Sequence, residues 1–277
     1  MSLIFTLTYS SNKFNKETIA ERINYLKLVE DSKECLIPSV FSLLDFYIYI
    51  RGVNLLLSGN AGYNNNGNLI ISKGHAASVF YLDIDKKDKF YLQKFGEDGS
   101  SLGIYANLEI SNILQPSGSL GHGVGVACGI LIANKNVNKP LFVILGDGEC
   151  YEGSVWEAIT FAVANKLNDL VIVVDNNKRC ILGDIEKILP IGNLEDKFNG
   201  FGCEVLKIDG HDFNELCLID DFIEKNRRKP KVIILDTIKG KGIKFMEDSP
   251  LWHNKHPGKE KISELISQFS GSLESAE

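Results

Sequence analysis

The sequence predicts an α/β protein: a single domain with a central parallel β-sheet flanked by helices. In the second half of the chain, runs of β-branched and aliphatic residues alternate with stretches of helical periodicity. Strands that alternate with helices pair in parallel through right-handed crossovers. In addition, polar residues directly follow two of the apolar runs, at Gly146-Asp147-Gly148 and at Asp175-Asn176-Asn177. The expected strands are 141–145, 170–175, 204–209 and 232–235, and the expected helices are 155–166 and 213–226.

The first half of the chain predicts more helix than strand. Residues 17–30 repeat apolar side chains at helical spacing, and residues 40–57 are apolar enough for a buried helix. A Gly/Asn loop at 59–68 leads into a short strand at 69–72. The remaining expectations are a helix at 76–82, a charged surface loop with some helix at 83–103, a small-residue loop and helix at 118–132, and a fraying amphipathic helix at 260–277.

Length and composition suit one large globular domain. The chain has 277 residues, 44% of them hydrophobic and 24% charged, which is enough for a full core. We assign residues 16–277 to the domain and expect residues 1–15 to be a poorly ordered N-terminal arm. The net charge of −6 argues against a nucleic-acid partner, and no apolar run approaches the roughly 18 residues of a membrane span. Scattered cysteines and the lack of a signal peptide lead us to expect a cytoplasmic protein with reduced thiols.

The polar residues at the two strand ends predict a site for Mg²⁺ and a diphosphate. The carboxyl ends of parallel strands meet at one edge of an open α/β sheet, where ligands bind. Asp147 supplies an anionic oxygen and Asn177 an amide oxygen, and Mg²⁺ accepts both. Gly146 lets a phosphate approach the backbone beside a helix N-terminus. A Gly-Asp-Gly sequence alone is more often an ordinary turn, but its combination with Asn177 favours the binding site.

These residues resemble those of a known family. The segment GDGECYEGSVWEA, which starts at Gly146, and the later VVDNNKRCILG are similar to the thiamine diphosphate motif of transketolases. The resemblance runs from about residue 36 to residue 258 and implies the thiamine diphosphate-binding fold, in the half that binds the diphosphate. Further segments match in the family's order: Ser72-Lys73-Gly74-His75, Gly118-Ser119-Leu120-Gly121-His122-Gly123, Ile208-Asp209-Gly210-His211-Asp212, Thr237-Ile238-Lys239-Gly240-Lys241-Gly242 and Trp252-His253.

The resemblance implies a role for each matching residue. Asp147, Asn177 and the backbone carbonyl of Arg179 would hold Mg²⁺, or Ca²⁺ or Mn²⁺ in its place. His75 and His253 would reach both the diphosphate and the reacting centre, and they are the catalytic candidates. The full expected cofactor-binding set is His75, Gly118, Ser119, Leu120, Gly146, Asp147, Gly148, Glu149, Glu152, Asn177, Lys241 and His253.

Other charged residues of the matching segments have simpler explanations. We expect Lys239 to be a solvated surface charge, whereas Lys241 is placed with the cofactor because glycines flank it. We expect His211 and His256 to be structural residues, hydrogen-bonded within loops. For His122, which replaces a glutamine of the family, a structural and a functional role stay equally open.

The resemblance covers only part of a transketolase. In the family, a pyrimidine-binding half supplies the glutamate that polarises the cofactor ring, and the segment after Gly258 is too short to contain it. We therefore expect the N-terminal subunit of a split transketolase, active only with a separate C-terminal subunit that brings this catalytic Glu. The expected assembly is an α₂β₂ heterotetramer with Glu152 at a subunit contact. The expected reaction transfers a two-carbon ketol unit from a ketose (phosphate) donor to an aldose-type acceptor.

Two positions depart from the family pattern and leave the donor open. Leu36 and Tyr105 stand where the family has histidines that hydrogen-bond the donor ketose. Losing both bonds in a buried site would weaken recognition of an α-hydroxyketose. The alternative function is therefore an enzyme with the same cofactor that uses a 2-oxo acid donor such as pyruvate to modify an unusual sugar. A non-catalytic subunit is a third possibility, against which the intact metal and histidine positions argue.

Overall fold

A parallel β-sheet forms the centre of the protein in the computed structural model. The structure describes residues 9–32, 35–53, 55, 68–83, 94–105, 114–116, 118–134, 139–225 and 228–275. Within these residues the sheet has five strands in the order β1-β2-β3-β7-β6, and every neighbouring pair is parallel. The strands are β1 (Leu69–Ile71), β2 (Leu141–Gly146), β3 (Leu170–Asn176), β6 (Glu204–Asp209) and β7 (Lys231–Asp236). The predicted α/β class and parallel sheet are confirmed.

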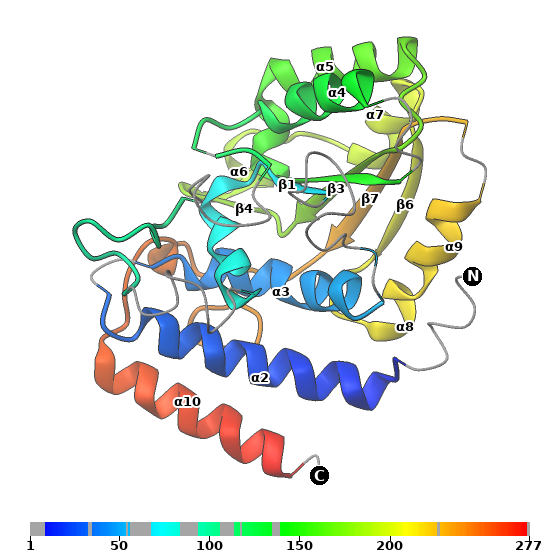
Figure 1. The fold of residues 1–277 in the computed structure, drawn as a ribbon. Helices are drawn as coiled ribbons and strands as arrows, with labels where there is room; N and C mark the ends of the chain where they lie inside the picture. Colours follow the sequence, from blue (N-terminus) through cyan, green and yellow to red (C-terminus); the bar gives the residue numbers. More distant parts are fainter. Residues whose placement is uncertain are drawn as a thin grey trace.

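Helices cover both faces of the sheet, so the protein has a layered α/β architecture (Figure 1). The helices of one face are α4 (Gly123–Ala133), α5 (Gly153–Ala164) and α7 (Leu194–Gly200). On the other side, α3 (Ile37–Gly52) lies next to the sheet, and α2 (Ser11–Val29) and α10 (Lys259–Glu274) lie outside it. Successive residues of β2 alternate between the two cores: Phe142 and Ile144 face one, and Val143 and Leu145 face the other. Burial on both faces explains the continuous apolar runs of the strands.

The buried helix α3 follows from its composition. Each residue from Ile37 to Ile50 is buried, and the segment is apolar all round, as expected of a helix enclosed by other elements. Pro38 lies in the first turn, where a helix needs no backbone N–H. Gly240 donates its backbone N–H to the carbonyl of Pro38 at 3.0 Å. The start of α3 is thereby tied to the loop that follows β7.

The N-terminal helix begins earlier than the sequence predicts. The Ser10 side chain accepts a hydrogen bond from the backbone N–H of Lys13 and caps α2, which starts at Ser11. Tyr9 is 2% exposed, and its ring packs edge-on against the rings of Phe14 and Phe213. Residues 9–15, which the sequence analysis assigned to the N-terminal arm, thus comprise a buried side chain, the cap and the first turns of α2. Residues 1–8 lie outside the described residues.

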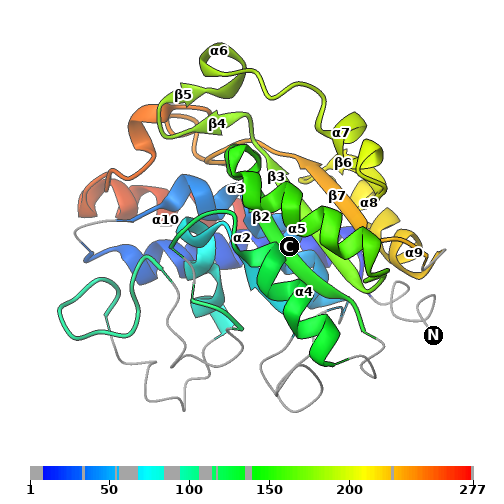
Figure 2. The same ribbon diagram turned by 90° about the horizontal axis from the view of Figure 1, so that it is seen from above.

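Several other boundaries differ from the prediction. The expected helix at 213–226 is two short helices, α8 (Phe213–Leu216) and α9 (Leu218–Glu224), and the expected helix at 76–82 is the 3₁₀ helix η3 (Gly74–Asp83). The loop expected at 59–68 lies outside the described residues apart from Asn68, as does much of 83–103. Elements between β3 and α7 that the sequence did not predict are the hairpin strands β4 (Arg179–Cys180) and β5 (Gly183–Asp184) and the helix α6 (Ile185–Ile188), which lie together beyond the sheet in Figure 2.

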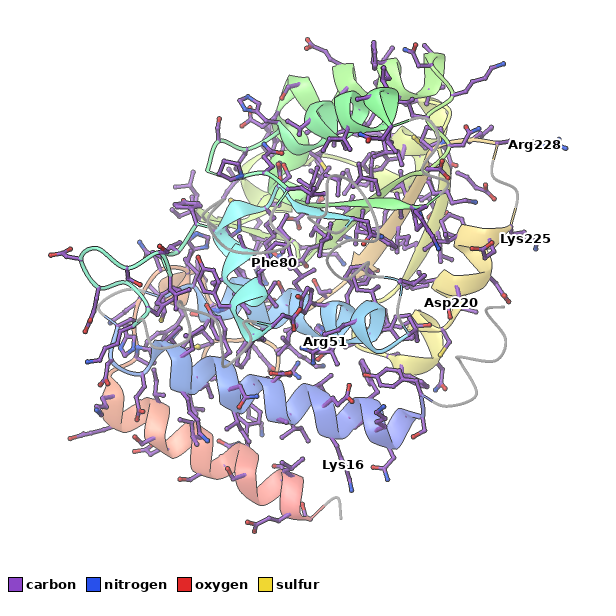
Figure 3. All side chains as sticks on the ribbon, in the orientation of Figure 1. Lys16, Arg51, Phe80, Asp220, Lys225 and Arg228 are labelled. Atoms are coloured by element: carbon purple, nitrogen blue, oxygen red, sulfur yellow. The ribbon has the colours of Figure 1, made fainter. Side chains whose placement is uncertain are left out.

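The strand register aligns the strand ends that matter for the site. Gly146 of β2 pairs with Asp175 of β3, and Asn176 of β3 pairs with Asp236 of β7. The chain segments that leave these strands therefore start from one edge of the sheet. Elsewhere, side chains such as Lys16 and Arg228 point outward (Figure 3). None of the described helices combines the length and apolar character needed to cross a membrane.

Candidate functional site

A pocket of about 480 Å³ lies at the carboxyl edge of the sheet. It is lined by most of the residues that the sequence predicts for the site. The predicted residues that line it are Leu36, His75, Tyr105, Gly118, Leu120, Gly146, Asp147, Gly148, Glu149, Asn177, Arg179 and His253. The lining residues that the prediction did not assign to a site are Lys73, Ile104, Cys180, Ile181, Lys239 and Asn254.

The two side chains among the three expected metal ligands follow directly after β2 and β3. Asp147 is 3% exposed, and its carboxylate accepts hydrogen bonds from the backbone N–H groups of Gly148 (2.7 Å) and Lys178. The side-chain oxygen of Asn177 accepts from the backbone N–H of Arg179 at 3.0 Å. Burial and the carboxylate of Asp175 raise the pKa of Asp147 to about 7.

These oxygens fit a hard divalent cation. A buried carboxylate whose pKa is raised gains most from a nearby positive charge, and the Asn177 amide and Arg179 carbonyl are neutral oxygens of the kind that Mg²⁺ accepts. The described residues contain no cluster of three or more His, Cys, Asp or Glu side chains suited to a metal. The donor set here is of a different type, with one carboxylate and two amide-type oxygens.

A buried ion pair lies beside the site, where Lys73 lines the pocket. Lys73 and Asp175 are 1% and 0% exposed, and the ammonium group of Lys73 contacts the Asp175 carboxylate directly. Lys73 also donates to the hydroxyl of Ser42 at 3.2 Å, and Ser42 and Thr237 donate to Asp175. Burial by itself would raise the pKa of Asp175, but Lys73 and the two hydroxyls hold it below its usual value. The positive charge beside the pocket is therefore fixed in place.

Glu149 joins the three loops that surround the pocket. Its carboxylate accepts hydrogen bonds from the hydroxyl of Ser72, from the backbone N–H of Gly121 (2.7 Å) and from that of Gly146 (3.3 Å). The Ser72 hydroxyl in turn accepts from the backbone N–H of Gly123 at 3.1 Å. A Cβ atom on Gly123 would lie 2.4 Å from the Cβ of Ser72, so this close approach requires glycine. Glu149 thus organises the site by hydrogen bonds to its loops.

Two histidines lie next to each other in the lining of the pocket. The ring centroids of His75 and His253 are 5.6 Å apart. Burial, together with the charges of Lys73 and Lys239, lowers the pKa of His75 well below its usual value. Burial and the same two ammonium groups lower the pKa of His253 to about 4. Both rings are therefore neutral at neutral pH and can donate one hydrogen bond and accept another.

The other three histidines lie outside the pocket. His211 bridges the Asp45 carboxylate (2.7 Å) and the backbone N–H of Ile238 (2.9 Å). His256 contacts the Val29 carbonyl at 3.0 Å and accepts from the backbone N–H of Gly258. Both side chains are hydrogen-bonded to protein groups, as expected of structural residues. His122 is exposed and precedes the first turn of α4.

Of the two lysines in the loop after β7, Lys239 lines the pocket and Lys241 does not. Lys239 is 3% exposed and lines the pocket, whereas Lys241 lies on the other side of the loop, beside Asp209 and His211. Burial and the charge of Lys73 lower the pKa of Lys239 to about 8. The expectations of a solvated Lys239 and of Lys241 at the cofactor pocket are therefore wrong in placement. The loop turns sharply at Gly240 and sends the two side chains apart.

Of the other predicted residues, Ser119 and Glu152 are exposed and do not line the pocket. Glu152 still lies close to the pocket's glycine loop, since a Cβ atom on Gly121 would be 2.6 Å from the Glu152 Cβ. Leu36 is 5% exposed and Tyr105 is 51% exposed, and both line the pocket. The two departures from the family pattern therefore border the same pocket as the expected metal ligands.

Two pocket residues that the sequence analysis did not assign to the site, Lys73 and Lys239, could have been identified from their positions after strand ends. Lys73 follows the end of β1 by two residues, and Lys239 follows the end of β7 by three. The strand-end rule that identified Asp147 and Asn177 applies equally to these lysines. The hairpin residues Cys180 and Ile181 had no such signal, because the hairpin itself was not predicted.

Comparisons with known proteins match this chain to one family. Residues 58–272 match the model of the transketolase thiamine diphosphate-binding domain. The chain is 31% identical over 213 residues to one of the subunits of the apulose-4-phosphate transketolase from Phocaeicola vulgatus, covering 75% of this chain and 76% of that protein. It is 35% identical over 201 residues to the 6-deoxy-6-sulfo-D-fructose transketolase subunit SqwG of a Clostridium species, covering 70% and 73%.

Longer relatives match over only part of their length. The chain is 32% identical to human transketolase over 226 residues, which are 76% of this chain and 34% of that enzyme. The crystal structure of Campylobacter jejuni transketolase superposes with a TM-score of 0.79 at 25% identity, covering 92% of this chain and 43% of that one. Transketolase from Leishmania mexicana, at 20% identity, shares the fold with a TM-score of 0.83. The relatives are transferases, and the chain belongs to the family of transketolase thiamine diphosphate-binding domains.

Proposed function

We propose that this chain is the diphosphate-binding subunit of a two-chain transketolase that depends on thiamine diphosphate and Mg²⁺. The observation that carries the proposal is the convergence at one sheet edge of Asp147, Asn177 and the Arg179 carbonyl with two buried lysines. In this proposal the three oxygens hold the metal, the loop at Gly148 borders the diphosphate, and the buried lysines make this edge of the sheet positive. When bound, thiamine diphosphate supplies a nucleophilic carbon and an electron sink.

The chain's own residues would position and polarise the reactants. His75 and His253 are neutral and line the pocket together, so each can donate an N–H to a substrate or phosphate oxygen. Lys73 is paired with Asp175, so it contributes mainly by fixing the geometry beside the pocket. The pocket's apolar lining at Leu120 would exclude water from a bound ring.

A partner chain is part of the proposal. The lining carboxylates Asp147 and Glu149 are both engaged with backbone N–H groups, so neither suits the role of polarising the cofactor ring. The relatives from P. vulgatus and Clostridium are themselves described as subunits. Apolar side chains on the outer sides of α4 and α5 are partly exposed, and we assign this surface to a subunit contact in an α₂β₂ assembly: Val126 is 38% exposed, Ile132 is 37% and Phe161 is 46%.

The donor has two candidates. A ketose (phosphate) donor with an aldose-type acceptor follows from the family. A 2-oxo acid donor such as pyruvate is favoured by one specific observation: Leu36, Ile104 and Tyr105 line the pocket and include no hydrogen-bonding side chain other than the Tyr105 phenol. A unit derived from pyruvate carries a methyl group where a ketol unit carries a hydroxymethyl group, and an apolar wall favours the methyl group.

The test is a donor screen on this chain co-purified with its C-terminal partner, with thiamine diphosphate and Mg²⁺ present. Mass spectrometry of the sugar products distinguishes the candidates. A product extended by a two-carbon unit from a ketose, without release of CO₂, supports the ketol transfer. A product extended by an acetyl-type unit, with CO₂ released from pyruvate, supports the alternative. Turnover that persists in Asp147→Ala or after complete removal of divalent metal would contradict both.

A further inference from the structure

The loop between β7 and His253 is folded tightly on itself. The backbone carbonyl of Lys239 accepts from the N–H of Asp248 at 2.9 Å, and the next residue, Gly240, donates to the carbonyl of Pro38. Gly240 has a φ of +85°, and a Cβ atom there would lie 2.8 Å from the carbonyl oxygen of Met246. The backbone of Lys239 is therefore held on both sides, which leaves its side chain a narrow choice of directions.

The Lys239 side chain reaches one ring nitrogen of His253. The distance from Lys239 Nζ to His253 Nδ1 is 2.9 Å. A second, longer contact of 3.5 Å joins Nζ to the carbonyl oxygen of Arg179. An ammonium group has donors only, so the Nδ1 atom that faces it must accept. A neutral imidazole that accepts at Nδ1 carries its proton on Nε2.

We infer that Lys239 is a positioning residue that fixes His253 in the tautomer with the proton on Nε2. His253 then offers the pocket an N–H donor and not a lone pair. The ring can hydrogen-bond an oxygen of a substrate or of a phosphate, but its Nε2 cannot take up a proton as a base. The hydrogen-bond partner of Nδ1 thus decides whether Nε2 donates or accepts.

A second histidine of the same chain has the opposite arrangement. His211 Nδ1 faces the carboxylate of Asp45, which can only accept, and its Nε2 accepts from the backbone N–H of Ile238. His211 therefore carries its proton on Nδ1. His256 accepts at Nδ1 from the backbone N–H of Gly258, so it shares the tautomer assigned to His253. One spectrum of this protein should contain both tautomers, which provides an internal reference for the measurement.

Nitrogen-15 NMR of the full chain labelled at histidine tests the inference at about pH 7, where an unperturbed imidazole is already mostly neutral. Long-range correlations from the ring carbon-bound protons show which nitrogen is protonated. The chain has five histidines, and the His253 signals are those lost in His253→Gln. We expect the Nε2–H pattern for His253 and the Nδ1–H pattern for His211. In the wild-type spectrum, a His253 signal with the proton on Nδ1, or one averaged between the two tautomers, would be enough to overturn the inference.

Variants of Lys239 test whether this residue selects the tautomer of His253. Lys239→Met removes the donor and should convert the single His253 pattern to a mixture, while Lys239→Arg, which also has donors only, should keep the Nε2–H pattern. Lys244→Met is the matched control, because Lys244 belongs to the same loop and is exposed. A His253 pattern unchanged in Lys239→Met would show that something other than Lys239 selects the tautomer, and the inference would fail.

A kinetic readout rests on the proposed function and is kept separate from the NMR readout. With cofactor saturating, loss of a well-aimed donor should lower kcat by about 10²-fold in Lys239→Met, with recovery in Lys239→Arg and little change in the donor's KM. A wild-type complex without activity would count against the proposed function only, and the tautomer measurement would still stand. Equal kcat values for wild type and Lys239→Met would exclude a catalytic use for the tautomer.

Discussion

Lys73 and Asp175 form an ion pair that is almost completely removed from water, with side-chain exposures of 1% and 0%. Ser42 and Thr237 donate hydroxyl hydrogen bonds to the same carboxylate. A buried pair of this kind is expensive to break, because the remaining partner becomes an uncompensated buried charge. The pair joins the end of β1 to the end of β3, so it also sets the relation between two walls of the pocket.

This relationship predicts a strong coupling in stability. Lys73→Met and Asp175→Asn should each lower the free energy of unfolding by about 3–5 kcal/mol, and the double variant should cost clearly less than their sum. Denaturant unfolding of the four proteins measures it. Lys207→Met is the control, since Lys207 and Asp236 form a pair at 3.4 Å whose side chains are 44% and 37% exposed, and such pairs contribute below about 1 kcal/mol. Additive single-variant effects would contradict the coupling.

A variant at Asn177 should affect cofactor binding much more than stability. Because it lies beyond the end of β3 and contributes no apolar burial, Asn177→Ala should weaken Mg²⁺-dependent binding of thiamine diphosphate by at least about tenfold while changing the stability of the free chain little. Calorimetric titration with the cofactor and Mg²⁺ measures the binding. Asn199→Ala, at an exposed position of α7, serves as the control. An unaltered affinity in Asn177→Ala would refute the metal assignment.

Glu149 should matter for both stability and binding. In Glu149→Gln an NH₂ group replaces one of the carboxylate oxygens. This group cannot accept from the donors that surround it, so buried donors lose their partner at a cost of about 1–3 kcal/mol. The three loops would then separate, and cofactor affinity should fall as well. Thermal unfolding with and without cofactor measures both effects. The idea fails if Glu149→Gln unfolds like the wild type and binds equally well.

Asp45 predicts sensitivity to acid. Burial would raise its pKa, but Arg22 at 2.7 Å and His211 at 2.7 Å hold it below its unfolded value of 3.8. As the pH falls below 3.8 the unfolded chain takes up a proton first, so this contribution to stability is present above that pH and is lost as the pH drops through the folded pKa. Asp45→Asn should flatten the acid limb of a plot of unfolding free energy against pH.

The control for this prediction is Asp31→Asn, because Asp31 and Lys259 form a pair whose side chains are 57% and 64% exposed. Asp31→Asn should leave the acid limb close to that of the wild type. An acid limb in Asp45→Asn as steep as in the wild type would mean that other carboxylates dominate the acid response.

The surface of α4 and α5 predicts an assembly defect. Phe161 is 46% exposed on α5, so Phe161→Glu should leave folding intact while it lowers the mass of the complex measured by light scattering. Leu218→Glu on α9, where Leu218 is 50% exposed, is the matched control and should assemble normally. A Phe161→Glu chain that assembles like the wild type would move the subunit contact elsewhere.

The sequence by itself determined the sheet and the core of the site. Continuous β-branched runs of strand length that alternate with helical segments favour strands buried on both faces, and parallel strands end at a common edge. Asp147 and Asn177 were therefore identifiable without coordinates, as were His75 and His253 through the family resemblance. Local capping signals were also present, but the Ser10 cap of α2 was missed because the burial of Tyr9 beside it depends on a distant helix.

Only the tertiary structure decided which lysine enters the pocket. Lys239 and Lys241 lie two residues apart in one glycine-flanked segment, and nothing local distinguishes them. The choice is made by hydrogen bonds from Gly240 to Pro38 and from Asp248 to Lys239, which connect segments far apart in the chain or fold the loop back on itself. The same holds for Glu149, whose partners Ser72 and Gly121 come from other loops. Periodicity determines which face of an element is buried, but the direction of a loop side chain is set by contacts that exist only after the sheet has assembled.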